Sequence, residues 1–182
     1  MSKRVVVIGI SAVLVVALAV GLYLFQPWRL VTDSTADEAL LVPTSTSTPT
    51  GSTTAGSTTA APTTTAPAGP VALASGPFRS LEHETTGSAT LVRLPGGGHA
   101  VQFEALDTSD GPDLYVYLSD KPSDSAESAF GSGFTNLGKL KANRGNQVYE
   151  VPGGADLATV RSVVIWCERF SAGFAVAPLE QS

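Results

Sequence analysis

The stretch Ser162-Val163-Val164-Ile165-Trp166-Cys167-Glu168-Arg169-Phe170 decides the fold of this chain. Successive side chains of an extended strand point to opposite faces of a sheet. Val163, Ile165 and Cys167 therefore share one face, while Val164, Trp166 and Phe170 take the other. The thiol lies among aliphatic residues and the indole faces the opposite layer, which indicates a strand at the centre of a layered β structure.

Period-two alternation, with Gly and Pro between the runs, extends this interpretation outward in both directions. Further strands are predicted over residues 89–94, 99–106, 114–118, 134–140, 146–151 and 173–178. Pro95-Gly96-Gly97-Gly98 joins the first two as a hairpin. Residues 120–132 are small and polar and predict a surface loop, and no amphipathic helix is expected in this region. We therefore expect an all-β fold, an antiparallel β-sandwich with a barrel as second choice.

The N-terminus differs from the rest, because residues 5–25 carry no charge and are long enough to cross a bilayer as a helix. Lys3 and Arg4 precede this run and favour a cytoplasmic N-terminus. The alternative is a cleaved signal peptide, since Ala17-Leu18-Ala19 has the form of a cleavage site. We expect a single-pass cell-membrane protein whose C-terminal domain lies outside the cytoplasm, or a protein secreted after cleavage.

The chain is expected to have three parts. Residues 1–30 form the membrane anchor or signal peptide, residues 31–70 a disordered linker, and residues 71–182 the β domain. Between Pro43 and Pro70 the chain consists of Thr, Ser, Pro, Ala and Gly. Such a segment buries too little apolar surface to offset its ordering entropy, so an extended stalk is predicted.

The formal net charge of −5 falls on the C-terminal domain, because three basic and three acidic residues cancel before residue 71. An acidic domain repels phosphate backbones, so nucleic acid is excluded as a partner. The sequence contains no GxSxG, P-loop, CxxC or CxxCH motif. His83 and His99 are the only histidines, and no metal site is predicted. Whether the domain is an enzyme stays open, and an electron-transfer or binding domain fits these residues better.

Cys167 is the only cysteine of the chain. An exported protein with one cysteine cannot close an intramolecular disulfide, which leaves three roles for the sulfur. It is a buried core thiol, an intermolecular bridge, or a reactive or ligand-bearing atom. Cys167 is the candidate catalytic redox residue and the candidate cofactor ligand. Trp166, next to it in the chain, is a candidate second residue in contact with a cofactor.

The order of several short motifs resembles the DM-thirteen domain, a family of electron-transfer domains of cell-surface proteins. The resemblance covers residues 76–179. It is carried by Gly76-Pro77-Phe78, Val101-Gln102-Phe103-Glu104, Gly111-Pro112-Asp113-Leu114-Tyr115-Val116-Tyr117-Leu118, Leu137-Gly138-Lys139-Leu140, Gly145-Asn146-Gln147-Val148-Tyr149 and Val163-Val164-Ile165-Trp166-Cys167. The resemblance implies a small β-rich domain with one characteristic cysteine, which acts as a bare redox thiol or holds a prosthetic group such as haem. Larger members join this domain to redox partner domains such as DOMON, and no such partner domain is expected in this chain.

Two functions follow as expectations. The first is a membrane-anchored extracytoplasmic domain that transfers electrons through Cys167, with an extracytoplasmic redox partner and an unidentified cofactor, haem being the candidate that the resemblance supplies. The second is a non-catalytic cell-envelope module that binds a polymer or protein, with Cys167 buried in the core. The second requires exposed, clustered aromatic side chains at Tyr115, Tyr117, Tyr149 and Trp166. A covalent dimer through Cys167 is a third, weaker expectation.

Overall fold

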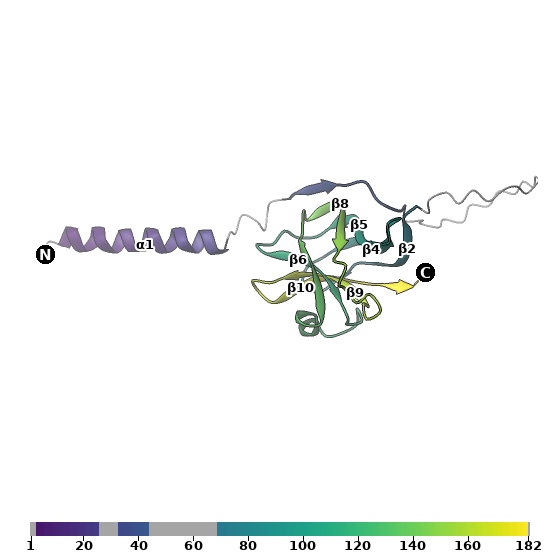
Figure 1. Cartoon of the computed structure of the whole chain (residues 1–182). Helices are drawn as coiled ribbons and strands as arrows, with labels where there is room; N and C mark the ends of the chain where they lie inside the picture. Colours follow the sequence, from purple (N-terminus) through teal and green to yellow (C-terminus); the bar gives the residue numbers. More distant parts are fainter. Residues whose placement is uncertain (1–2, 26–32, 44–68, 182) are drawn as a thin grey trace, which may run out of the picture.

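The computed structural model of the chain describes residues 3–25, 33–43 and 69–181. Its N-terminal element is helix α1 (Lys3–Phe25), at the left of Figure 1. The side chains of residues 1–10 and 24–32 lie outside the described part, so the predicted span over residues 5–25 falls partly outside it. Among the residues that are described, no helix is long and apolar enough to cross a membrane.

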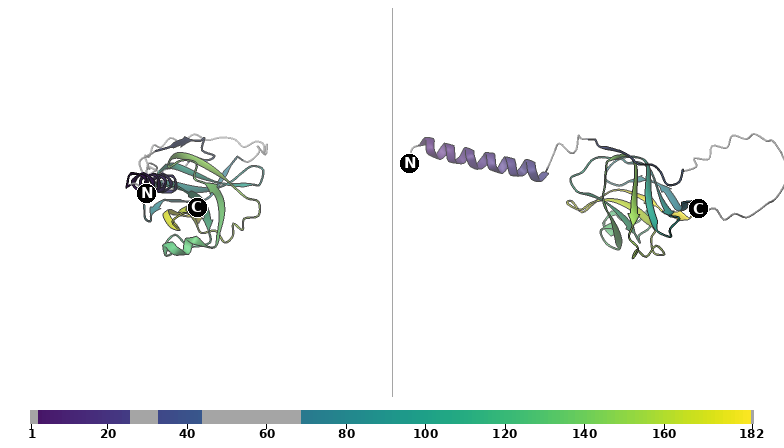
Figure 2. Two further views of the ribbon diagram at one scale, coloured as in Figure 1. Left: turned by 90° about the vertical axis from the view of Figure 1, so that its left-hand side faces the viewer. Right: turned by 45° about the horizontal axis from the view of Figure 1, so that its top comes forward.

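The β domain consists of two sheets, as the sandwich prediction requires, and nearly all of its strands pair antiparallel (Figures 1 and 2). The first sheet has the strand order β1 (Thr35–Asp37), β8 (Arg144–Val151), β5 (His99–Asp107), β4 (Thr86–Arg93), β2 (Val71–Pro77) and β11 (Glu180–Gln181). The second has the order β3 (Arg79–Ser80), β10 (Ala172–Pro178), β9 (Ser162–Cys167), β6 (Leu114–Ser119) and β7 (Phe134–Lys139).

The core lies between the two sheets because each contributes one apolar face. Phe103, Val116 and Ile165 are fully buried there, and Cys167 belongs to the same cluster. A second, smaller cluster covers the outer face of the second sheet: Tyr117, Phe130, Val164, Trp166 and Val176. The alternation predicted for β9 is confirmed, since its odd residues face the inner cluster and its even residues the outer one.

Phe170 departs from that alternation. Strand β9 ends at Cys167, and the turn that follows is closed by the Ser171 amide, which donates to the Glu168 carbonyl. Ser171 adopts a positive φ of 51° in this turn. Phe170 is therefore 56 % exposed at the tip of a hairpin, and its predicted place on the outer face of the strand is wrong.

The predicted surface loop over residues 120–132 contains the short 3-10 helix η2 (Glu127–Gly131). Its Phe130 is fully buried in the outer cluster, so this segment covers the second sheet instead of standing free. The Glu127 carboxylate accepts a hydrogen bond of 2.7 Å from the Gly173 amide, which ties the segment to β10. A single Phe among small polar residues carries no periodicity, which is why the sequence indicated a loop.

The predicted linker is wrong over residues 33–43, which form a strap along the edge of the first sheet. Strand β1 of this strap pairs parallel to β8, in register from Thr35 opposite Arg144 to Asp37 opposite Asn146. In Figure 1 the strap crosses above β8. The rest of the predicted linker, residues 44–68, lies outside the described residues.

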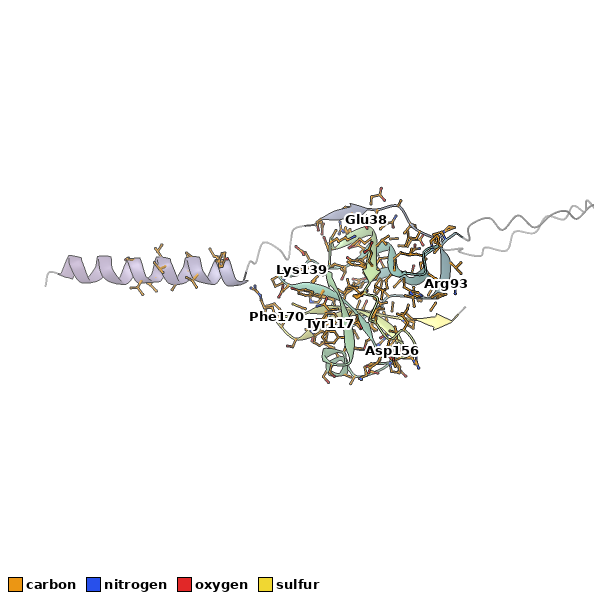
Figure 3. All side chains as sticks on the ribbon, viewed as in Figure 1. Glu38, Arg93, Tyr117, Lys139, Asp156 and Phe170 are labelled. Atoms are coloured by element: carbon orange, nitrogen blue, oxygen red, sulfur yellow. The ribbon has the colours of Figure 1, made fainter. Side chains whose placement is uncertain are left out.

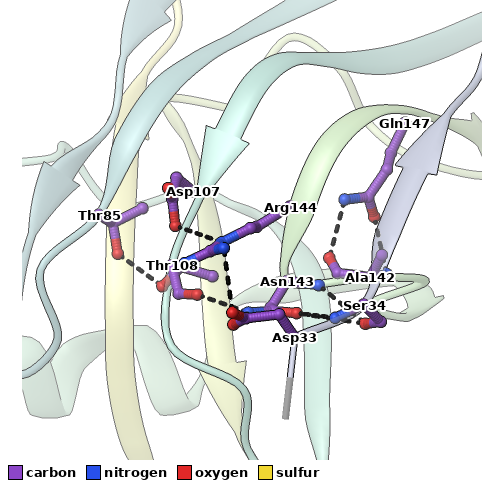
Figure 4. A network of polar contacts seen from close by, with 9 residues as sticks. All are labelled: Asp33, Ser34, Thr85, Asp107, Thr108, Ala142, Asn143, Arg144 and Gln147. Carbon is purple, nitrogen blue, oxygen red and sulfur yellow. Dashed lines mark hydrogen bonds and ion pairs between the residues drawn. The ribbon is translucent and has the colours of Figure 1, made fainter. Parts of the chain in front are cut away.

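Two buried amide side chains of the domain hold the strap. Gln102 is fully buried, and its Oε1 accepts hydrogen bonds from the Leu41 and Val42 amides while its Nε2 donates to the Val42 carbonyl. Asn143 is 1 % exposed, accepts from the Ser34 amide at 2.7 Å and donates to Asp33 at 3.0 Å (Figure 4). A buried amide without a partner costs about 1–3 kcal/mol, so the folded unit needs the strap.

Candidate functional site

Cys167 is the last residue of β9, the central strand of the second sheet, between β10 and β6. Its side chain points inward and is 1 % exposed. Leu114, opposite it on β6, and Phe174 of β10 belong to the same core cluster. The sulfur therefore lies in the apolar interior at the end of the strand, as a free thiol.

This position limits what the sulfur can do. Thiol–disulfide exchange and an intermolecular bridge both require direct contact between two sulfur atoms, and neither is compatible with a side chain that is 1 % exposed. A haem group has a macrocycle much larger than any side chain, and the close-packed residues around Cys167 leave no room for it. The residues present therefore do not fit a haem at this sulfur.

No histidine completes a catalytic pair with Cys167 among the contacts of the described residues. His83 stacks on Phe174, with ring centroids 3.8 Å apart and an interplanar angle of 23°. His99 lies at the start of β5, opposite Arg93 on β4 in the first sheet. Within the described part of the chain, no three His, Cys, Asp or Glu side chains gather where they could hold a metal ion.

Trp166 turns to the outer face and packs in the outer cluster, 5 % exposed. Tyr117 of β6 lies in the same cluster and is 1 % exposed. Phe134 of β7 stacks on the Tyr117 ring, with centroids 3.8 Å apart and planes 4° from parallel. The aromatic side chains thus form a layer that starts at the residue next to Cys167 and continues across β6 to β7.

A cleft of about 540 Å³ lies over this layer. It is lined by Tyr117, Ser128, Gly131, Ser132, Phe134, Trp166, Glu168 and Ser171. We call it the aromatic cleft. The Tyr117 hydroxyl donates a hydrogen bond of 2.7 Å to Glu168 Oε1, and Glu168 itself is exposed. Figure 3 labels Tyr117 in the lower sheet of that view, with Phe170 at the edge of the domain.

The environment of Tyr117 keeps its phenol protonated. Burial raises the pKa of the Tyr117 hydroxyl well above its usual range, and the hydrogen bond and charge of Glu168 act in the same direction. A carboxylate that accepts a hydrogen bond from a phenol stabilises the neutral phenol and opposes a second negative charge beside it. The Tyr117 phenol therefore keeps its proton and donates it in the hydrogen bond to Glu168 Oε1.

The exposed aromatic platform that a polymer-binding module requires is not found at the four predicted residues. Tyr117, Tyr149 and Trp166 are each at most 5 % exposed, and Tyr149 belongs to the inner cluster between the sheets, whereas Tyr117 and Trp166 belong to the outer cluster. Tyr115 is half-buried and receives the Lys139 ammonium 5.5 Å from its ring centroid. The structure thus separates Tyr149 from the other three.

A further cleft, of about 490 Å³, lies beside the Gly111-Pro112-Asp113 turn and also contains Ser34 of the strap and Lys139 of β7. The Gly111 amide donates a hydrogen bond of 2.8 Å to Asp110 Oδ1, a local contact of the kind that stabilises turns. Lys139 forms an ion pair with Asp113 at 3.1 Å. The charged side chains that line this cleft are paired with neighbouring groups, as Lys139 is with Asp113. The cleft therefore offers no chemistry comparable to that of the aromatic cleft.

Sequence reasoning missed Glu168 and Phe134 as parts of a site. Glu168 directly follows the strand end, which is a signal that the sequence does contain. Its partner Tyr117 could not be inferred, because that requires knowing that β6 lies beside β9, with Tyr117 opposite Val164. Phe134 could not be inferred as part of the site without knowing that β6 pairs with β7.

The model of the family described as "Electron transfer DM13" matches residues 77–179. This range contains the strands of both sheets except β1, β11 and all of β2 but Pro77, and it contains Cys167, Tyr117 and Glu168. No curated protein and no solved structure gives a significant match to the chain.

Proposed function

Since the chain belongs to the DM13 electron-transfer family, we propose that its β domain exchanges electrons with an extracytoplasmic partner protein and that Cys167 is its internal redox residue. The family match over residues 77–179 carries this proposal. The position of the chain's only cysteine in the central strand of the matched region supports it.

The burial of Cys167 favours one kind of redox chemistry over another. A sulfur that is 1 % exposed cannot meet the sulfur of a partner protein, whereas a single electron crosses several ångströms of packed protein without contact between the reacting atoms. One-electron exchange through the surrounding side chains is therefore the proposed mode, and thiol–disulfide exchange is not. In this step a one-electron oxidant of the partner is reduced, the S–H bond of Cys167 breaks to leave a neutral thiyl radical, and the proton leaves at the strand end, where the exposed Glu168 follows Cys167.

We expect a thiol reagent to label Cys167 slowly in the native full-length chain and fully after denaturation, because the native fold covers the sulfur. Cys167→Ser should then lower the yield of electrons that a photogenerated ruthenium(III) oxidant withdraws from the native protein. Ser162→Ala is the matched control, since Ser162 is a fully buried residue at the other end of β9. Unchanged electron yield in Cys167→Ser would remove the cysteine from the proposal.

The same burial favours a second candidate function, a binding module in which Cys167 only packs the core. Free cysteine is among the most buried residue types and behaves as a small apolar side chain. In that case Cys167→Ser changes the stability of the domain, and its electron yield equals that of the Ser162→Ala control. A protein or polymer of the cell envelope is then the proposed partner, bound at a surface other than the buried aromatic layer.

We further propose that residues 5–25 anchor the chain in the cell membrane with the β domain outside the cytoplasm. The uncharged run behind Lys3 and Arg4 supports this location. Alkaline extraction of host membranes tests it, because an anchored chain stays in the pellet. Recovery of a chain shortened by cleavage after Ala19 in the medium supports the secreted alternative instead.

A further inference from the structure

A buried redox residue needs a way for its electron to reach a partner at the surface, and the outer face of the second sheet provides one. Trp166 precedes Cys167 in β9, so their side chains leave opposite faces of the same strand. Trp166 packs in one cluster with Tyr117. Both line the aromatic cleft at the surface of this sheet.

Tyr117 differs from the other aromatic residues of this layer because it has a base at its hydroxyl. The phenol donates to Glu168 Oε1 at 2.7 Å, which is within the range for direct proton transfer. A phenol that loses an electron becomes a strong acid and must release its proton at once. The exposed Glu168 carboxylate accepts that proton and can pass it on to water.

The surroundings of Tyr117 also protect the species that such a step creates. Its ring is 1 % exposed and lies under the stacked ring of Phe134. This cover keeps water and dissolved reagents away from the oxidised ring. Phe134 itself is 37 % exposed, so only this one side chain separates Tyr117 from a partner bound in the cleft.

On the premise that the domain transfers electrons, we propose that Tyr117 is the residue at which electrons enter and leave it and that Glu168 is the proton acceptor of this exchange. A one-electron oxidant at the aromatic cleft, such as the metal centre of a partner protein, takes one electron from Tyr117. The phenol O–H bond breaks and the proton moves to Glu168 Oε1. The products are a neutral tyrosyl radical, a protonated Glu168 and the reduced partner, and one electron with the same proton reverses the step.

The chain contains a matched control for this proposal. Tyr149 is also buried, at 3 % exposure, and its hydroxyl donates to Gln147 Oε1 at 2.5 Å. An amide oxygen is a far weaker base than a carboxylate, so it is a much poorer acceptor for the proton of an oxidised phenol. Burial raises the pKa of Tyr149 as it does that of Tyr117, so the two tyrosines differ chiefly in their acceptor and in their access to the cleft.

The experiment is flash oxidation of the full-length chain in detergent by a ruthenium(III) polypyridyl complex, followed by freeze-quenched electron paramagnetic resonance. The wild type is expected to give a tyrosyl radical that Tyr117→Phe removes and Tyr149→Phe leaves in place. Glu168→Gln should slow radical formation by about 10²-fold, the typical effect of losing a positioned base. It should also alter the rate ratio between H₂O and D₂O, which a purely structural role of Glu168 would not do.

A tyrosyl radical that persists at full yield in Tyr117→Phe, or that disappears in Tyr149→Phe, overturns the inference. If Tyr117→Phe loses no electron yield while Cys167→Ser does, the domain transfers electrons by another route, so the inference fails and the proposed function stands. If the wild-type chain gives up no electron to the oxidant, the proposed function itself fails. Thermal unfolding checks that Tyr117→Phe, which keeps the stacked ring, retains the fold.

Discussion

At the scale of single residues, Gly145 shows how closely the strap approaches the domain. Its φ is +95°, a conformation that residues with a Cβ rarely adopt. A Cβ at this position would also collide with the carbonyl oxygen of Ala36 in β1. Gly138 has a similar φ of +111°, but a Cβ there meets no atom within 4 Å. Substitution of Gly138 therefore tests backbone strain alone, whereas substitution of Gly145 tests backbone strain together with the contact to the strap.

We expect Gly138→Ala to lower the free energy of unfolding by about 1–2 kcal/mol, the cost of placing an L-residue at positive φ. Gly145→Ala should lose more than this, because the added methyl group also pushes β1 away from β8. Denaturant unfolding measures the two losses. Hydrogen exchange at the Glu38 amide, which donates to the Asn146 carbonyl, reports release of the strap. Equal losses in the two variants would show that the strap does not press on Gly145.

Residue patterns predicted the faces of β9 correctly from Val163 to Cys167, because alternation is a local property of an extended chain. They failed at Phe170, because the turn after the strand end depends on the register with β10. The partnership of Tyr117 with Glu168 spans 51 positions. Contacts of that range follow from strand order, which no local pattern contains.

At the scale of elements, the seven strands with clear alternation were predicted to within a few residues, and the hairpin of β4 and β5 is confirmed. Strands β1, β3 and β11 were missed because each has at most three residues. Strand β2 was missed because Val71-Ala72-Leu73-Ala74-Ser75-Gly76-Pro77 has little alternation. Its pattern of burial comes from its place between β4 and β11.

The attachment of β1 has an acid-sensitive part at Glu38. Lys141 forms an ion pair with its carboxylate at 2.7 Å, and the Val148 amide donates to it at 2.8 Å. The hydrogen bond from Lys141 is the largest influence and lowers the pKa of Glu38 below its usual value. A carboxylate with a lowered pKa stabilises the fold above its unfolded-state pKa, and this contribution disappears as the pH falls through the folded-state value.

Glu38→Gln should therefore lower the stability at neutral pH by less than about 1 kcal/mol, since the ion pair is partly exposed. The difference from the wild type should shrink as the pH falls below the ordinary carboxyl range. Denaturant unfolding from pH 7 down to pH 3 gives this curve. A difference that stays constant with pH would mean that the charge of Glu38 contributes nothing.

At the scale of the whole molecule, residues 33–43 and 69–181 are the described parts of the β domain, and they flank residues 44–68 on both sides. The Thr/Ser/Pro-rich segment is thus attached to the domain at both ends. The prediction of a stalk between membrane and domain assumed that the domain starts at residue 71. Composition carried no signal for the bound residues 33–43, because their attachment depends on Gln102 and Asn143, which are distant in sequence.

This topology predicts that a cut in the segment does not separate the two halves of the protein. A specific protease site inserted after Gly56 should, once cleaved, give fragments that still elute together in size-exclusion chromatography, because residues 33–43 remain bound to β8 and Gln102. The same cut in Gln102→Ala should release the fragments more readily. Immediate separation of the cut wild-type chain would mean that the strap is held only by its covalent connection.

The strap also limits the distance between a membrane anchor and the domain. With residues 33–43 bound, the distance between a membrane anchor and the domain is set by residues 26–32 alone, which span at most about 25 Å when fully extended. Residues 44–68 can then be lengthened, shortened or glycosylated without changing the distance between the domain and the lipid. If residues 5–25 anchor the chain in a membrane and the domain exchanges electrons, as proposed, its partner has to work close to the bilayer surface.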